Sequence, residues 1–297
     1  MYSVKHIRTA NLGDSLRTPI VGRLGSWQLD RKIGEGHWTN VYQARPCGDC
    51  SHSDYAVKAL KPEFARDPQA VAMLQREMRV ARDVSHPHLI SVLSAHVHEP
   101  PFFLVIPRLT GSTVRQALTQ WGPFDVPRAL WLVRQTAEAL SEIHARGWIH
   151  ADIKPDNLFV GPNGFLTVFD LGMARLLSDS RSGDRLAGTP AYLPPEAFST
   201  EMSWSGASDV YSLGVTLYEL LTGKLPFVQA EPEALAEAVL TRPAPDPRHL
   251  LPGLSLNIVR LVRRMLSKES ARRPQIDELV SCLVDLEIDS FEERRAI

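Results

Sequence analysis

The stretch "HADIKPDN", residues 150–157, combines side chains that suit the transfer of a phosphoryl group. A hydroxyl that attacks phosphorus needs a carboxylate to accept or orient its proton, oxygen ligands for Mg²⁺, and positive charge near the transferring phosphate. Asp152 is suited to the proton and Lys154 to the charge. Asn157 and the later Asp170, in "VFDLG", are suited to the metal. The spacing therefore predicts a catalytic loop next to a Mg²⁺ site.

Two upstream features are suited to holding a nucleotide. In "IGEGHWTNVY" (33–42), Gly34 and Gly36 would let the backbone approach phosphates closely, although two glycines in a hairpin more often form just an ordinary turn. Lys58 lies in the apolar run "YAVKAL", where a buried ammonium needs an anionic partner. Glu77 is positioned to be that partner, and a solvated surface pair is the alternative interpretation.

A strand-rich part followed by a helix-rich part must position these residues. Residues 27–107 alternate β-type runs and turns, and the runs at 40–44 and 55–60 are predicted to form a hairpin through the polar loop 45–54. One helix interrupts the strands, and amphipathic helices dominate after Gly111. The positions expected on the buried faces of four helices are Val71, Leu74, Met78 and Ala81; Leu130, Val133, Ala137, Leu140 and His144; Val210, Leu213, Leu217 and Leu220; and Ile258, Leu261 or Val262, and Met265.

Taken in order, these motifs resemble those of eukaryotic-type (Hanks-type) serine/threonine protein kinases, a family with bacterial members, over about residues 27–286. The resemblance implies an α+β, bilobal fold with a small antiparallel β-sheet lobe that carries one helix, and a larger, mainly helical lobe. It also implies ATP and Mg²⁺ as cofactors. Asp152 and Lys154 would be catalytic, and Asn157 and Asp170 would be the metal ligands. The nucleotide-binding residues would be Ile33, Gly34, Gly36, Val41, Ala56, Lys58, Glu77, Pro107 and Leu109.

The downstream half of the resemblance indicates what is phosphorylated. "GTPAYLPPE" (188–196) resembles the end of an activation segment, which cradles a peptide and is usually absent from small-molecule phosphotransferases with the same core. Asp209 resembles the aspartate of the large lobe, and Arg273 would pair with Glu196. Lys154 follows the serine/threonine pattern. The expected partners are therefore proteins with Ser or Thr acceptors.

The same resemblance predicts the domain boundaries. They are a mobile N-terminal extension (1–26), a kinase domain (27–290) and a C-terminal tail (291–297). Within the domain, the N-lobe would be 27–106, the hinge 107–112 and the C-lobe 113–290.

The departures from the family pattern bear on regulation. Thr39 replaces the third glycine of the loop, and Leu171 replaces the phenylalanine of Asp-Phe-Gly. Ala151 replaces an arginine that in many kinases grips a phosphate on the activation segment. Because Asp152 remains, we expect an active enzyme whose activation segment is ordered by packing or by a partner. The alternative is a pseudokinase or scaffold that binds nucleotide or partners without efficient transfer. Candidate phosphoacceptors are Ser178, Ser180, Ser182 and Thr189.

The composition is that of an ordinary soluble globular protein, with 297 residues, 44% hydrophobic residues, 23% charged residues and a net charge of −1. This charge provides no general attraction to nucleic acid. No apolar run approaches the roughly 20 residues of a membrane span, and the N-terminus lacks the apolar core of a signal peptide. Three cysteines indicate a reducing compartment, so a cytoplasmic location is expected. Nothing in the sequence points to an oligomeric state.

Two further clusters resemble metal sites but have simpler interpretations. Cys47 and Cys50 form a C-x-x-C with His52 nearby, yet a structural zinc site needs four ligands and Cys282 lies far away in the sequence. The histidines at 86, 88, 96 and 98 fit a turn and an alternating strand better than a metal centre.

Overall fold

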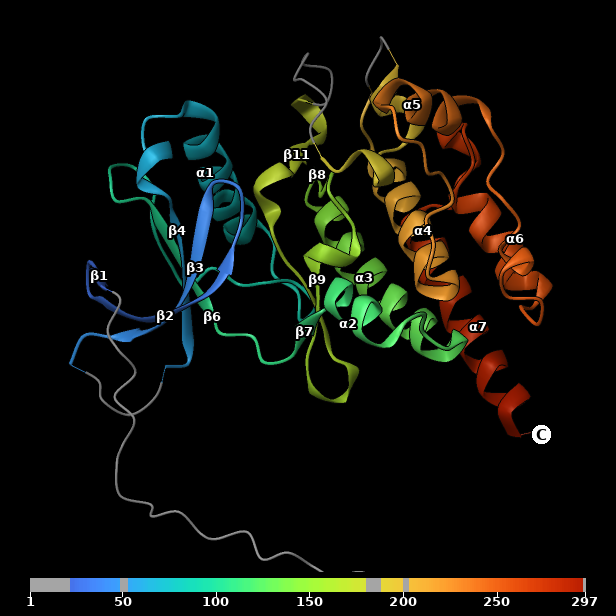
Figure 1. The fold of residues 1–297 in the computed structure, drawn as a ribbon, viewed down its shortest axis with the longest axis horizontal. Coiled ribbons are helices and arrows are strands. Elements are labelled where there is room, and N and C mark those ends of the chain that lie inside the picture. The colour runs from blue at the N-terminus through green and yellow to red at the C-terminus, as the bar shows by residue number, and fades with distance from the viewer. Residues whose placement is uncertain (1–21, 49–52, 180–187, 200–202, 296–297) are drawn as a thin grey trace, which may run out of the picture.

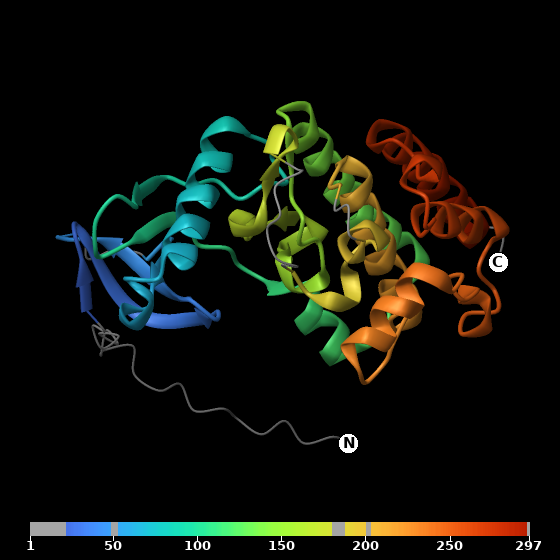
Figure 2. The ribbon, with the colours of Figure 1, turned by 90° about the horizontal axis from the view of Figure 1, so that it is seen from above.

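The computed structural model describes residues 22–48, 53–179, 188–199 and 203–295. The chain forms a strand-rich N-terminal lobe followed by a mainly helical C-terminal lobe, as the sequence predicts (Figures 1 and 2). The N-terminal lobe is a six-stranded antiparallel sheet with the order β1-β2-β3-β4-β6-β5. Its strands are β1 (Gly22–Leu24), β2 (Trp27–Glu35), β3 (Thr39–Pro46), β4 (Tyr55–Leu60), β5 (Ser94–His96) and β6 (Phe103–Pro107).

The predicted hairpin is confirmed as the antiparallel pair β3–β4. Val41 lies opposite Lys58, and Gln43 lies opposite Ala56. Directly opposed residues in an antiparallel pair point to the same face of the sheet, so Val41, Ala56 and Lys58 share one face. This register carries the lysine towards the C-terminal lobe.

Helix α1 (Pro68–Asp83) is the one α-helix among the described residues of the N-terminal lobe. Asp67 caps it by accepting hydrogen bonds from two backbone amides of the first turn, and Pro68 starts it with a suitable fixed φ. The buried side chains are Ala70, Leu74, Glu77 and Val80. The observed buried face is thus shifted by about one residue from the predicted face, because the side chain of Glu77 points inward to pair with Lys58.

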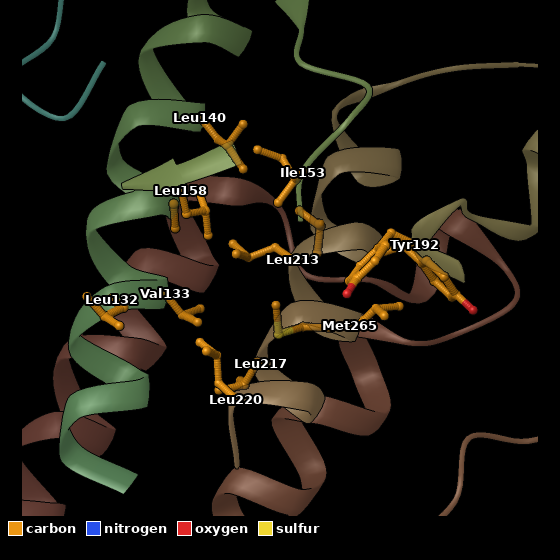
Figure 3. Close-up of a cluster of buried hydrophobic side chains, with 14 of the residues drawn as sticks. Leu132, Val133, Leu140, Ile153, Leu158, Tyr192, Leu213, Leu217, Leu220 and Met265 are labelled. Carbon is orange, nitrogen blue, oxygen red and sulfur yellow. The ribbon is translucent and has the colours of Figure 1, made fainter. Parts of the chain in front are cut away.

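The C-terminal lobe is built around helix α4, whose residues from Ser208 to Leu221 are all buried. Its α-helices are α2 (Val114–Trp121), α3 (Val126–Ala145), α4 (Gly206–Thr222), α5 (Pro232–Thr241), α6 (Leu256–Met265) and α7 (Ile276–Arg295). Figure 3 shows core side chains of α3, α4 and α6, with Val133, Leu213 and Met265 pointing into one cluster. The short strands β7 (Ser112–Thr113), β8 (Trp148–Ile149), β9 (Leu158–Val160), β10 (Leu166–Val168) and β11 (Arg175–Leu176) carry the loops of the site.

Both ends of the folded part extend past the boundaries predicted for the domain. Gly22–Leu24 pairs with Trp27–Leu29, so part of the predicted N-terminal extension forms an edge strand of the sheet. Helix α7 runs to Arg295, so the tail predicted from residue 291 begins inside a helix. Residues 1–21 lie outside the described part of the chain. Across that part, no helix combines the length and hydrophobicity of a membrane span.

Candidate active site

Lys58 joins the two lobes through a pair of carboxylates. Its ammonium lies 2.6 Å from Oε2 of Glu77 on α1 and 2.8 Å from Oδ1 of Asp170 in the C-terminal lobe. The predicted pairing of Lys58 with Glu77 is confirmed as a buried contact, in place of the solvated pair that was its alternative. Asp170 has a left-handed backbone with φ of 65°, which is uncommon for a non-glycine residue.

Lys58 and Asp170 stabilise each other's charge, whereas burial, together with the nearby Asp170, raises the pKa of Glu77. Although burial disfavours an ammonium, the carboxylates of Asp170 and Glu77 raise the pKa of Lys58 above its ordinary value. In turn, the ammonium of Lys58 lowers the pKa of Asp170. Lys58 is therefore charged, and Asp170 is ionised, throughout the physiological pH range. The side chain of Asp170 is still 40% exposed, which leaves it accessible to a ligand.

Asp152 is the centre of the second half of the site. Its Oδ2 accepts hydrogen bonds from Nζ of Lys154 at 2.7 Å and from Nδ2 of Asn157 at 2.8 Å. The ammonium of Lys154 also donates to Oγ1 of Thr189 at 2.6 Å. The 3₁₀ turn Pro155–Asn157 brings Asn157 back towards the carboxylate. The structure therefore brings together the predicted catalytic pair, one predicted metal ligand and the start of the "GTPAYLPPE" segment.

The backbone just before Asp152 is hydrogen-bonded to the side chain of Asp209 on α4. Its two carboxylate oxygens accept the amide hydrogens of His150 and Ala151, each at 2.8 Å. His144 on α3 lies 2.8 Å from the same carboxylate. Burial favours the neutral acid, but the contact with His144 and the other partners lower the pKa of Asp209 overall. Ala151 is held at φ of 62°, so the anchored loop has a fixed, sparsely populated backbone conformation.

Ala151 lies in an apolar cluster, where the family pattern has an arginine. The cluster contains Ile149, Ala151, Leu193, Ala197 and Trp204. It packs the loop before Asp152 against the segment after the "GTP" motif. The guanidinium of Arg175 lies 4.9 Å from the ring centroid of Trp204.

Neither glycine of the glycine-rich turn has a positive φ, so neither is required there by backbone conformation. Gly34 lies opposite Val41, and a Cβ added to Gly34 would come within 3.4 Å of the side chain of Val41. The amide of Gly36 donates to the carbonyl of Thr39 at 2.8 Å, which closes the turn. Thr39 begins β3 with a negative φ, so a β-branched residue causes no strain there.

The hinge lies beside the strand that carries Lys58. Ala56 is buried and lies opposite Ile106, and Tyr55 lies opposite Pro107. The amide of Arg108 donates to the carbonyl of Asp54 at 2.9 Å, which fixes the chain direction just before Leu109. Ile33, in contrast, is 44% exposed at the edge of β2. Of these predicted positions, Ile33, Ala56 and Pro107 lie on strands of one sheet, whereas Leu109 follows the end of β6 by two residues.

The activation segment is tied to the C-terminal lobe by two polar clusters. The predicted pair is confirmed: Nη2 of Arg273 lies 2.7 Å from Oε2 of Glu196, and Nη1 lies 2.7 Å from Oε1. Sequence reasoning missed the second cluster, in which Arg115 on α2 contacts Tyr192 and lies 2.7 Å from Oε1 of Glu219. No local motif marks Arg115, because its partners are distant in the sequence.

The two clusters set aside as metal sites have other contacts where they are described. Cys47 is exposed, while Cys50 and His52 lie outside the described residues. Nδ1 of His88 lies 2.8 Å from the carbonyl of Leu166, and His96 stacks on Phe103. These rings take part in lobe packing.

The bilobal α+β fold and this constellation are those of a protein kinase domain. Residues 27–283 match the family described as "Protein kinase domain", so the chain belongs to that family. Among its relatives, serine/threonine-protein kinase PknD of Mycobacterium tuberculosis is 33% identical over 86% of this chain and 38% of its own length. PknB of Mycobacterium leprae is 34% identical over 84% of this chain and 41% of its own length. The serine/threonine-protein kinase pkn3 of Myxococcus xanthus is 32% identical over 84% of this chain and 47% of its own length. The matched region thus spans less than half of each of these relatives.

Proposed function

We propose that this protein is an ATP-dependent serine/threonine protein kinase that works without an arginine before its catalytic aspartate. One observation carries the proposal: the Lys58–Asp170 ion pair is assembled, while Asp152 is contacted by Lys154 and Asn157. Every charge type that phosphoryl transfer needs is present in this arrangement.

Asp152 orients the attacking hydroxyl and accepts its proton. Asn157 donates to Oδ2 of Asp152, which limits rotation of the side chain, and Oδ1, which accepts a long hydrogen bond from the amide of Thr189 at 3.4 Å, is the oxygen that would receive the substrate hydroxyl. Lys154, which contacts both Asp152 and Thr189, places a positive charge between the carboxylate and the segment that would hold the peptide. This charge offsets the negative charge of the transferring group.

Lys58 positions the α- and β-phosphates of the nucleotide. Its partner Glu77 is buried on α1, so the position of that helix determines the position of the ammonium. Gly34 and Gly36 leave room for the backbone above the phosphates. The hinge residues Pro107 and Leu109 would offer a carbonyl and an amide to the adenine.

Asp170 and Asn157 fit a Mg²⁺ ion. The carboxylate of Asp170 is ionised and partly exposed, and the amide nitrogen of Asn157 is already bonded to Asp152, which leaves its oxygen for a cation. Hard oxygen ligands in small number suit Mg²⁺, which keeps several waters or phosphate oxygens. When bound, the ion neutralises charge on the phosphates.

The experiment is γ-phosphate transfer from Mg-ATP to a generic protein and to the kinase itself, comparing the wild type with Asp152→Asn. This change keeps the shape of the side chain but removes the proton acceptor, so we expect a loss of about a hundredfold or more. Phosphoamino-acid analysis should show phosphoserine or phosphothreonine. Equal, background-level transfer by both proteins, with nucleotide binding intact, would identify a pseudokinase, and phosphotyrosine alone would contradict the acceptor class.

A further inference from the structure

The tip of the glycine-rich turn is attached to a second segment of the N-terminal lobe. Residues 36–38 form this tip, between the end of β2 and the start of β3. Residues 61–64, which we call the clasp turn, follow directly after β4. The amide of Lys61 donates to the carbonyl of Trp38 at 2.8 Å. This hydrogen bond joins the clasp turn to the tip.

Aromatic rings strengthen this attachment. The ring centroid of His37 lies 5.5 Å from that of Phe64 and 5.2 Å from that of Trp38. Trp38 and Phe64 are half-buried, and both pack against the core cluster that contains Leu60 and Leu74. Large aromatic side chains bury much apolar area, so the tip is held by packing as well as by its backbone.

An ion pair offsets the charge of the turn. Glu35 lies between the two glycines, so its carboxylate is near the place where the anionic phosphates would bind. Its Oε1 lies 3.0 Å from Nζ of Lys61, and its other oxygen contacts Lys32. The ammonium groups of Lys32 and Lys61 lower the pKa of Glu35 to about 2, so the carboxylate is ionised. Lys61, whose side chain is only 14% exposed, thereby offsets a negative charge that would repel phosphate.

The clasp turn is well ordered by its own hydrogen bonds and continues into α1. The amide of Phe64 donates to the carbonyl of Lys61, and the amide of Asp67 donates to the carbonyl of Phe64, each at 3.0 Å. Asp67 in turn caps α1, the helix that carries Glu77. The tip is thus connected through a few residues to the elements that hold Lys58 in place.

The clasp turn fixes a loop that would otherwise have to be ordered when a ligand binds. Such ordering costs entropy and weakens the affinity, whereas a loop that is already held in place avoids this loss. We propose that Lys61 and Phe64 are positioning residues, which hold the backbone of the glycine-rich turn where it contacts the phosphates of ATP. The identity of the nucleotide rests on the proposed function. Because the tip would contact the phosphates and not the adenine, the clasp turn should affect the binding of ATP but not that of adenosine.

The first test measures the affinity of the full chain for Mg-ATP and for adenosine by calorimetry. Phe64→Ala removes the ring from the clasp turn, whereas Phe64→Tyr keeps it. Phe291→Ala, at a position of α7 that is 50% exposed, is the matched control. We expect Phe64→Ala to bind Mg-ATP about tenfold more weakly and to bind adenosine as the wild type does. Phe64→Tyr and the control should bind both ligands like the wild type.

The second test asks how Lys61 acts. Lys61→Met removes one of the two ammonium groups that contact the carboxylate of Glu35, so we expect Mg-ATP to bind severalfold more weakly. Adding Glu35→Gln removes the negative charge and should restore the affinity of the wild type. A loss that this second substitution does not restore would show that Lys61 contacts the phosphates itself, and it would overturn the positioning role of Lys61.

Steady-state transfer separates this inference from the proposed function. In Phe64→Ala the KM for ATP should rise about tenfold while kcat stays within about threefold of the wild type, because Asp152 and Asp170 are unchanged. An unchanged affinity and KM, or equal weakening for Mg-ATP and adenosine, would overturn the inference and leave the proposed function standing. A wild-type chain that binds Mg-ATP, shows the expected effects of the variants on binding and transfers no phosphate would overturn the proposed function alone.

Discussion

Lys58 is held by carboxylates from two lobes, and its proposed role in catalysis can be tested separately from its role in folding. Lys58→Met removes the charge that positions the phosphates, while the methionine fills much of the space of the lysine stem. Glu77 loses its partner but can take up a proton, which limits the loss of stability. We expect the transfer rate to fall about a hundredfold or more and the free energy of unfolding to change by about 1–2 kcal/mol.

Single-turnover rates and urea unfolding measured on the same samples test this separation. Lys224→Met, at an exposed position of the C-terminal lobe, is the control and should change neither quantity. If stability and rate collapsed together in Lys58→Met, the residue would have a mainly structural role.

A second prediction at the residue scale concerns Lys268 and the dependence of the free energy of unfolding on pH. Burial, and then the nearby Arg273, lower the pKa of its ammonium from 10.5 to about 8. Between these values the unfolded chain binds more protons than the folded one, so the stability contributed by this residue rises with pH. Relative to Lys268→Met, the wild-type free energy of unfolding should rise from about pH 8 to about pH 10, by on the order of 1 kcal/mol after solvent screening.

At the scale of elements, the loop around Ala151 is held by apolar packing, at the place where the family pattern has a charged arginine. Ala151→Arg would place a guanidinium among Ile149, Leu193 and Trp204, where neither space nor a carboxylate partner is provided by the described cluster. Overpacking and charge burial should together lower the free energy of unfolding by about 1–3 kcal/mol. Urea unfolding measures this change.

Ala151→Gly is the companion variant at this position. The glycine accepts the φ of 62° without a Cβ clash, so its stability should stay close to that of the wild type. A stable Ala151→Arg protein that gained phosphate-dependent activity would show that the loop has room for the familiar arginine after all.

At the scale of the whole molecule, the activation segment is joined to the C-terminal lobe by contacts that need no phosphate. Arg273 grips Glu196 through both oxygens, and Arg115 links Tyr192 to Glu219. We therefore expect transfer to stay within about tenfold after complete dephosphorylation, even with the three candidate serines changed to Ala. These are Ser178 in the described part of the chain, and Ser180 and Ser182 outside it.

The measurement is specific activity before and after phosphatase treatment, with mass spectrometry to confirm that the phosphate is gone. A larger loss that returned on rephosphorylation would contradict the expectation. It would direct attention to Arg175, which lies close to this segment on β11.

Local sequence was enough to predict several elements because their signals are local. The β3–β4 hairpin follows from two alternating runs with a polar loop between them, and the buried faces of α3 and α6 follow from helical spacing. The positions of Asp152, Lys154 and Asn157 were also readable, since a short loop keeps them within reach of one another whatever the rest of the chain does.

Contacts between distant segments were decided only by the tertiary structure. Asp170 reaches Lys58 across the lobes, and Arg115 meets Glu219 over a long sequence separation. The edge strand at Gly22–Leu24 was missed because a three-residue strand is stabilised mainly by its neighbour, and local sequence carries little of that signal. The sequence likewise shows that Ala151 stands where the family pattern has an arginine. Only the tertiary structure shows that Leu193 and Trp204 pack in an apolar cluster with this alanine.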